Sequence, residues 1–366
     1  MGSGIFKSKT RHPVLAWSRK SQQLAEMRIV TLLTVLFGGF FRADAFDPAQ
    51  QDDSQALVRH FKKPSIPLGP PIKKGAFVPN PGETITLMGG ADIYRMQEYP
   101  DFDILMHSAW KSKALRIRNI GWSADTVYRQ QRPMFFYTGK GDPREGSVPD
   151  LREKIDPGTF ILMFGKMESL DGDPQLPGFE ASYESLITEL KKSSQRIVLV
   201  APIPFVGADE TSFSFVGEID SGRGLAEERN AVLTKYRECI QSLAAKMGVR
   251  YLDSGEYESN AYSGNGIHLS EIGQRQFAIR LATALGWKGQ QLEGVESLVR
   301  KKNQLWYQYY RPTNWAFLFG DRQNVPSSRD NEDPERRWFV EEIEKIPPLI
   351  AKSERQIGKL TEGLVK

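Results

Sequence analysis

The stretch Thr159–Phe164 reads TFILMF, and the turn Gly165–Glu168, GKME, follows it at once. The run carries no charge, has the length of a strand and lacks the alternation of a strand with one wet face. Continuous runs of this kind are typical of strands buried on both faces, which occur in parallel sheets covered by helices. The sequence at this point therefore predicts an α/β protein.

Outward from this strand, strand-like and helix-like patterns alternate along the chain. The strand-like segments are residues 85–88, 115–120, 196–201 and 249–252, and the helix-like segments are residues 103–113, 148–155, 179–192, 225–247 and 270–285. This alternation favours a parallel sheet with helices on both faces. We therefore expect an α/β three-layer sandwich with a five-stranded parallel, flavodoxin-like sheet over about residues 84–288.

The segments on either side of this domain differ from it in composition. Residues 46–83 are rich in Pro, Gly, Lys and Asp and predict an extended lead-in. Residues 289–366 predict a helical C-terminal extension, in which residues 341–362 have the spacing of an amphipathic helix interrupted by Pro347-Pro348. Aromatic side chains of the extension either dock it onto the main domain or stack on sugars; they are Trp306, Tyr310, Trp315 and Phe319.

The N-terminus has the order of parts found in a secretory signal. Residues 1–28 are basic, residues 29–41 are uncharged and mostly apolar, and Ala43-Asp44-Ala45 has the small-x-small pattern of a cleavage site. The apolar run is short for a bilayer span. We expect residues 1–45 to be a signal peptide cut after Ala45, leaving a secreted or periplasmic chain without a stable transmembrane segment. An uncleaved amphipathic anchor is the alternative, and Met27 offers a second start.

The composition of the chain limits the partners and the kinds of site that it can have. The chain has 366 residues, with 49 Lys and Arg against 45 Asp and Glu, a formal net charge of +4. This near balance argues against nucleic acid as a partner, because such a partner needs a more basic surface. Cys239 is the single cysteine, which excludes an internal disulfide and a multi-cysteine metal site. We expect no cofactor and no metal, and histidine chemistry must use one of four residues, namely His12, His60, His107 and His268.

Polar or glycine-bearing turns follow the predicted strands. Four of these turns are residues 89–92, 122–125, 165–168 and 202–204. Ligands of open α/β sheets bind at the carboxyl ends of the strands. The four turns are therefore where we expect a site.

These turns and their order resemble the SGNH (GDSL) hydrolase family, and within it an exported subgroup with changed catalytic motifs. The family has Gly-Asp-Ser after the first strand, Asn-x-x-x-Ser-Gly-Asp-Thr after the second, Gly-x-Asn-Asp/Glu after the third and Asp-x-x-His near the end. The matching segments here are Met88–Ala91 (MGGA), Asn119–Thr126 (NIGWSADT), Gly165–Glu168 (GKME) and Asn265–His268 (NGIH). The resemblance covers about residues 84–288 and implies an ester hydrolase that acts on a small-molecule or glycan ester, with acylated carbohydrate as one candidate.

The departures from the family pattern fall on its catalytic positions. In the family the serine is the nucleophile, backbone N–H groups and the asparagine side chain form the oxyanion hole, and the aspartate orients the histidine. Here the serine position is Ala91, the glycine donor of the second motif is Ala124, and the asparagine donor is Met167. The orienting residue is Asn265, and only His268 is kept.

Several mechanisms stay open without the serine hydroxyl. Loss of the nucleophile of a serine triad costs on the order of 10⁶ in kcat. Asp92, one residue past the serine position, or Ser123 in the second turn offers a substitute nucleophile, and His268 acting as a general base on water is the third option. Glu168 either lines the cleft or is a structural carboxylate. The other interpretation is a non-catalytic pseudo-hydrolase that binds a glycan or another ligand in the same cleft.

Overall fold

The computed structural model describes residues 61–128 except 74, 155–207, 223–318 and 322–364. The predicted signal peptide, the first part of the lead-in and nearly all of the predicted helix at 148–155 lie outside these residues. Their predictions therefore stay predictions. In the described part of the chain, no helix is long and apolar enough to cross a bilayer.

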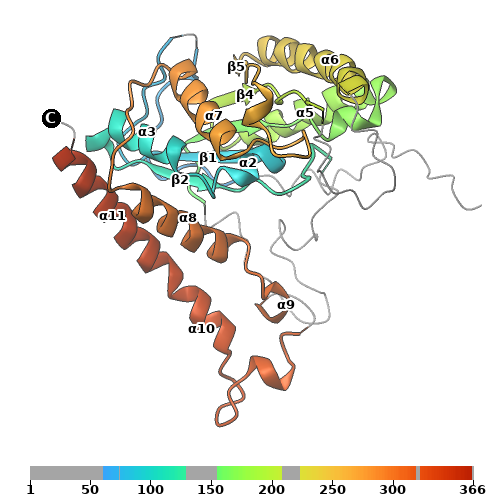
Figure 1. Ribbon diagram of the computed structural model, residues 1–366. Coiled ribbons are helices and arrows are strands. Elements are labelled where there is room, and N and C mark those ends of the chain that lie inside the picture. Colours follow the sequence, from blue (N-terminus) through green and yellow to red (C-terminus); the bar gives the residue numbers. More distant parts are fainter. Residues whose placement is uncertain (1–60, 74, 129–154, 208–222, 319–321, 365–366) are drawn as a thin grey trace, which may run out of the picture. The chain divides into compact units, whose positions relative to one another are not determined.

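Five parallel strands form one sheet in the order β2-β1-β3-β4-β5 (Figure 1). Their bounds are β1 Thr84–Gly89, β2 Arg116–Asn119, β3 Thr159–Met163, β4 Ile197–Val200 and β5 Arg250–Leu252. This order is the flavodoxin-like one, in which the connections change direction between β1 and β3 and ligands bind beside that point. The predicted five-stranded parallel sheet is confirmed.

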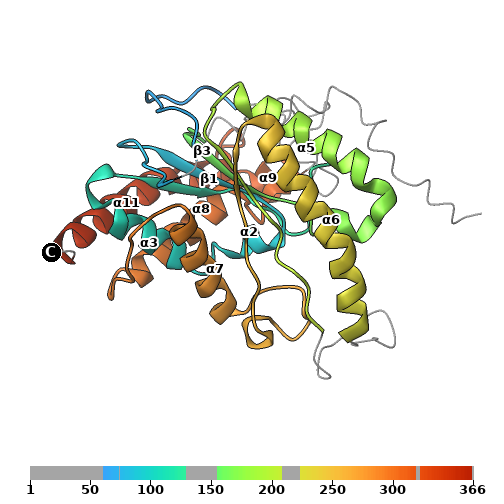
Figure 2. The ribbon, with the colours of Figure 1, turned by 90° about the horizontal axis from the view of Figure 1, so that it is seen from above.

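Helices cover both faces of the sheet, as Figures 1 and 2 show. Those of the main domain are α2 Ala91–Arg95, α3 Asp101–Ala109, α5 Leu176–Lys191, α6 Arg223–Met247 and α7 Glu271–Ala284. Alternate residues of β3 explain the two layers, because successive side chains of a strand point to opposite faces. Phe160 and Leu162 share an apolar cluster with α5 and α6, whereas Ile161 and Met163 share one with α3 and α7. The three-layer prediction is confirmed.

Short 3-10 helices complete the connections. They are η3 Lys111–Lys113, η5 Glu168–Asp171, η6 Asp173–Gln175, η7 Ser259–Ala261 and η8 Pro326–Ser328. The helix predicted over 103–113 therefore ends as an α-helix at Ala109 and resumes as η3. Ala114 follows η3 in the left-handed conformation, with φ 48°. That residue closes η3 and sends the chain into β2.

The C-terminal extension consists of helices, as predicted. They are α8 Glu296–Tyr310, α9 Trp315–Leu318, α10 Trp338–Glu344 and α11 Ile346–Leu364. The predicted helix at 341–362 is divided at Lys345 rather than at Pro347-Pro348. The two prolines lie in the first turn of α11, where a missing N–H costs no helical hydrogen bond.

Two aromatic residues of α8 dock the extension onto the sheet. Trp306 and Tyr310 are 2% and 1% exposed, and their rings stack with centroids 5.3 Å apart. Trp306 Nε1 also donates to the carbonyl of Asn119, at the end of β2, over 2.8 Å. These two side chains are therefore used in packing and are not available to stack on a sugar. The side chains of Trp315 and Phe319 lie outside the described residues.

A buried group of charges joins α8 to α3. Lys302 Nζ donates to Asp103 Oδ1, and Asn303 Nδ2 lies 3.5 Å from Asp103 Oδ2. The side chains of Lys302 and Asp103 are only 1% and 6% exposed. His107 follows one turn later on α3, and burial lowers its pKa to about 4, although Asp103 acts in the opposite direction. We call Asp103, His107 and Lys302 the clasp trio.

The end of α8 also supports the second turn. Arg311 Nη2 donates to the carbonyl oxygens of Asn119, over 3.1 Å, and of Gly121. The Asn119 side chain in turn accepts from Gly121 N over 2.9 Å and donates to the carbonyl of Ile93 in α2 over 2.6 Å. The extension, the second turn and the helix after β1 are therefore fixed to one another.

Candidate active site

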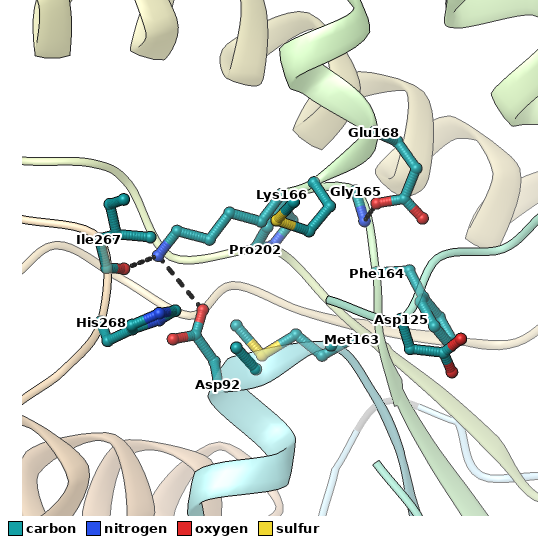
Figure 3. A pocket seen from close by; sticks show the side chains of 13 residues that line it. Asp92, Asp125, Met163, Phe164, Gly165, Lys166, Glu168, Pro202, Ile267 and His268 are labelled. Carbon is teal, nitrogen blue, oxygen red and sulfur yellow. Dashed lines mark hydrogen bonds and ion pairs between the residues drawn. The ribbon is translucent and has the colours of Figure 1, made fainter. Parts of the chain in front are cut away.

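A small cavity of about 30 Å³ lies at the carboxyl ends of the strands. All four turns singled out in the sequence contribute to its wall, together with the segment before α7 (Figure 3). The lining residues are Gly90, Ala91, Asp92, Asp125, Met163, Phe164, Gly165, Lys166, Met167, Glu168, Pro202, Ile267 and His268. The volume leaves room for a water molecule but not for an acyl group.

Ala91 and Asp92 bring the start of α2 to the cavity. Ala91 is the first residue of that helix, so the position that carries the family's serine faces the site with a methyl group. Asp92 is only 5% exposed. The carboxylate that the sequence offered as a substitute nucleophile therefore lies inside the site.

Lys166 crosses the cavity and was not singled out in the sequence. Its Nζ lies 3.3 Å from Asp92 Oδ2, donates to the carbonyl of Ile267, and sits 5.2 Å from the centre of the Phe205 ring. Burial lowers the pKa of Lys166, while Asp92 acts in the opposite direction. In the family motif this position is the variable x of Gly-x-Asn, which gave no reason to select it. The available signal was a charged residue placed directly after a fully buried strand.

The turn after β3 explains how Lys166 reaches the cavity. Gly165 has φ 107°, a conformation that glycine adopts without steric cost. A β-carbon there would also approach the side chain of Ile240 within 3.1 Å. The chain can therefore reverse sharply behind the strand, and the next side chain points back across the strand ends.

His268 faces Asp92 and Lys166 from the opposite wall (Figure 3). Burial lowers its pKa, Asp92 opposes this, and Lys166 lowers it further. The imidazole is therefore held in its neutral form near neutral pH, which is the form that can accept a proton. Ser270 fixes this segment, because it caps α7 by accepting from Gly273 N over 3.3 Å.

Asn265 lies outside the cavity wall and serves the turn. Its Oδ1 accepts from Ser263 Oγ over 2.8 Å, and from the backbone N–H groups of Ile267 over 3.0 Å and His268 over 3.3 Å. This is the side-chain-to-backbone pattern that asparagine makes in turns. The structure therefore gives Asn265 a backbone role beside His268 and shows no bond to the imidazole.

Glu168 lines the cavity and is also a structural carboxylate. It is 1% exposed and accepts from Val127 N and Gly165 N, each over 2.8 Å. Burial raises its pKa to about 7, and these backbone donors act against that rise. The residue therefore ties the second turn to the third. Met167, in the place of the oxyanion asparagine, is half-buried in the cavity wall.

The second turn contributes less than its motif suggested. Ser123 is exposed, and neither Ser123 nor Ala124 is among the residues that line the cavity. Ala124 has φ 59°, the left-handed conformation that suits the glycine of the family motif. Asp125 is the residue of this turn that reaches the wall.

The wall contains no serine, threonine or cysteine among the described residues. Cys239 lies on α6, and burial raises its pKa to about 11, so its thiol stays protonated. Besides Asp125 and Glu168, the titratable groups in the wall are Asp92, Lys166 and His268, which we call the cleft trio. Among the described residues, no three His, Cys, Asp or Glu side chains are placed to hold a metal ion.

Comparisons with known proteins gave likenesses at low similarity among solved structures. No family model and no curated protein matches the sequence. Among solved structures, an acetylxylan esterase of Geobacillus stearothermophilus aligns with TM-score 0.40 and 15% identity, over 57% of this chain and 96% of that one. A GDSL-like lipase of Parabacteroides merdae aligns with TM-score 0.41 and 13% identity, over 58% and 99%. The assignment of the fold rests on the strand order given above and not on these likenesses.

Proposed function

We propose that this chain is an exported SGNH-like ester hydrolase that uses a water molecule, rather than a serine, as its nucleophile. The observation that carries the proposal is the cleft trio, which gathers a carboxylate, an ammonium and a neutral imidazole in one cavity without a hydroxyl. Burying a charged side chain costs free energy unless the charge is paired or takes part in binding or catalysis. Groups with perturbed pKa values in a cleft are candidates for chemistry.

The proposed step needs no acyl-enzyme. A water oxygen attacks the carbonyl carbon of the ester, and its proton passes to the His268 imidazole. The negative charge of the tetrahedral intermediate forms next to the Lys166 ammonium, which stabilises it. The intermediate then releases the alcohol, which takes the proton back from His268. An entering acyl group must displace the Met167 side chain, because the cavity itself is too small and Lys166 has to stay beside Asp92 and the intermediate.

The resemblance supports a carbohydrate O-acyl ester as the substrate class. The test compares hydrolysis of p-nitrophenyl acetate and of an acetylated oligosaccharide by the wild type and two histidine variants. His268→Ala is expected to lose about 10²–10⁴ of kcat/KM, the usual share of a general base. His107→Ala, the matched change in the clasp trio, is expected to keep activity at temperatures where it is folded. Equal activity in wild type and His268→Ala would contradict the proposed step.

A non-catalytic pseudo-hydrolase is the second candidate, favoured by the small cavity and by Met167 in the oxyanion position. Ala91→Ser separates the two. An inactive wild type together with a gain of hydrolysis in Ala91→Ser would show a site that has kept its frame and lost its reaction. Activity in the wild type that disappears in His268→Ala would remove this candidate.

Export is part of the proposal and rests on the sequence pattern of residues 1–45. Expression of the full chain in a Gram-negative host, followed by N-terminal sequencing of the periplasmic protein, tests it. The expected mature chain starts at Phe46. A membrane-bound product that keeps residues 29–41 would instead support the uncleaved anchor.

A further inference from the structure

The buried carboxylate of Asp92 uses only one of its oxygens. Its Oδ2 lies 3.3 Å from Lys166 Nζ, whereas its Oδ1 has no hydrogen-bond partner among the described residues. A buried acceptor left without a donor carries the full cost of its lost hydration. Such an atom in a native structure therefore marks a place where a donor is expected.

The imidazole of His268 has the complementary gap. Its Nδ1 is buried and has no hydrogen-bond partner among the described residues. In Figure 3 the carboxylate oxygen of Asp92 that is not bonded to Lys166 points toward the His268 ring. Both residues line the same cavity, which has room for a water molecule.

Asn265 is not in a position to fill this gap. Its Oδ1 already accepts from Ser263 Oγ and from the two backbone N–H groups of Ile267 and His268. An amide oxygen has two lone pairs, and the two backbone N–H groups already occupy both, which leaves no capacity for an imidazole N–H.

We propose that Asp92 has taken over from Asn265 as the positioning residue of His268. Asp92 Oδ1 accepts the Nδ1–H proton of the imidazole directly across the cavity, while Lys166 holds the carboxylate in place. A carboxylate can only accept, so this pairing fixes the proton on Nδ1 and leaves Nε2 as the basic nitrogen. The acid of the pair then comes from the first motif instead of the last. Its catalytic meaning rests on the proposed function, but the pairing itself does not.

The charged groups around His268 predict how its ionisation responds to each change. Asp92 raises the imidazole pKa, and Lys166 and Arg95 lower it, in addition to the lowering by burial. Asp92 and Arg95 belong to α2, and Lys166 belongs to the turn after β3. Asp125 of the second turn lines the same cavity.

The test is two-bond ¹⁵N–¹H NMR on protein labelled at histidine, with the His268 signals identified by their loss in His268→Gln. The wild type is expected to show the Nδ1–H tautomer. Asp92→Asn is expected to lower the His268 pKa by about one unit or more, and Lys166→Met to raise it. Asp103→Asn, the matched change in the clasp trio, should leave the His268 signals unmoved, and Asn265→Ala should keep the tautomer.

An Nε2–H tautomer in the wild type would overturn the pairing, and this measurement needs no variant to fold. A larger pKa change in Asn265→Ala than in Asp92→Asn would overturn it as well. The outcome is separate from that of the proposed function. Nδ1–H with a shift in Asp92→Asn, but without ester hydrolysis, keeps the pairing and removes the enzyme. Hydrolysis together with Nε2–H does the reverse.

Discussion

The cleft trio and the clasp trio contain the same three residue types in two different regions of the fold. The three clasp residues and Asp92 are buried, whereas Lys166 and His268 are partly buried. In the clasp, Asp103 has a partner for each carboxylate oxygen, Lys302 and Asn303. In the cleft, Asp92 Oδ1 and His268 Nδ1 each lack a partner among the described residues.

The difference between the two regions lies in unused bonding capacity rather than in residue type. A buried charge pair whose polar atoms are all hydrogen-bonded needs no role beyond the contact that it makes between two elements. A buried pair with unbonded atoms beside a cavity is unfavourable as a pure contact, so it points to a ligand, a water or a reaction. Position agrees, because the cleft trio lies at the strand ends, where open α/β sheets bind ligands.

The largest difference between the trios is expected in stability. Lys302→Met leaves Asp103 buried without its cation, and removal of one partner of a buried pair costs about 3–5 kcal/mol. Lys166→Met is expected to cost less than half as much, because Asp92 borders a cavity that can admit water. Urea denaturation at pH 7 measures both losses.

A loss in Lys166→Met equal to that in Lys302→Met would contradict this view of the cleft as the less closed region. If Lys302→Met does not fold, the paired variants Asp103→Asn/Lys302→Met and Asp92→Asn/Lys166→Met give the same comparison without an isolated charge. The clasp pair is again expected to show the larger change.

His107 of the clasp and Glu168 of the cavity wall are expected to affect the pH dependence of stability in opposite directions. Because the pKa of His107 is lowered to about 4, the native state binds fewer protons than the unfolded chain between that value and 6.5. The stability that His107 contributes is therefore full above pH 6.5 and falls as the pH drops through this window, by at most about 3 kcal/mol. His268 acts in the same direction as His107, since its pKa is also lowered. Glu168 acts in the opposite direction, because burial raises its pKa to about 7 and its contribution is lost as the pH rises through nearly the same window.

Urea denaturation at several pH values between about 4.5 and 7.5, a range that covers the window set by these pKa values, tests the prediction. His107→Gln should make stability fall more as the pH rises through this window, because the opposing Glu168 contribution remains, while His268→Gln should change the slope less. A larger change of slope in His268→Gln than in His107→Gln would assign the histidine titration to the cleft instead.

The sequence predicted the sheet because burial on both faces leaves a continuous apolar run, as in Thr159–Phe164. It also predicted that the turns after the strands would meet, because parallel strands end on one edge. Asp92 and His268 were candidates for this reason, and both line the cavity. These predictions depend on local pattern and on one rule of topology.

The remaining features depend on contacts that no local pattern encodes. Lys166 lies 74 positions from Asp92, and Lys302 lies 199 positions from Asp103. A lysine in a sequence is usually a solvated side chain, so neither partner was selected. The role of Asn265 was also hidden, because its identity fits both an orienting residue and a turn residue, and only the hydrogen bonds separate the two.

The smallest predicted effect compares two alanines in the left-handed conformation, one beside the cavity wall and one in a connection before β2. Ala124 has φ 59° in the second turn, and Ala114 has φ 48° just before β2. This conformation costs an L-residue roughly 1–2 kcal/mol in the folded state. A glycine avoids that cost, but it also makes the unfolded chain more flexible, which offsets part of the gain in stability. Ala124→Gly and Ala114→Gly are therefore each expected to stabilise the protein by up to about 1 kcal/mol.

Their effects on hydrolysis are expected to differ although their effects on stability are alike. Ala124 precedes Asp125, a residue of the cavity wall, whereas Ala114 closes η3 and does not line the cavity. Backbone strain beside an active site is more often linked to function than the same strain in a connecting segment. If Ala114→Gly changed kcat/KM as much as Ala124→Gly, the strain in the second turn would have no special link to the cleft. A change confined to Ala124→Gly would place that backbone among the parts that hold the site.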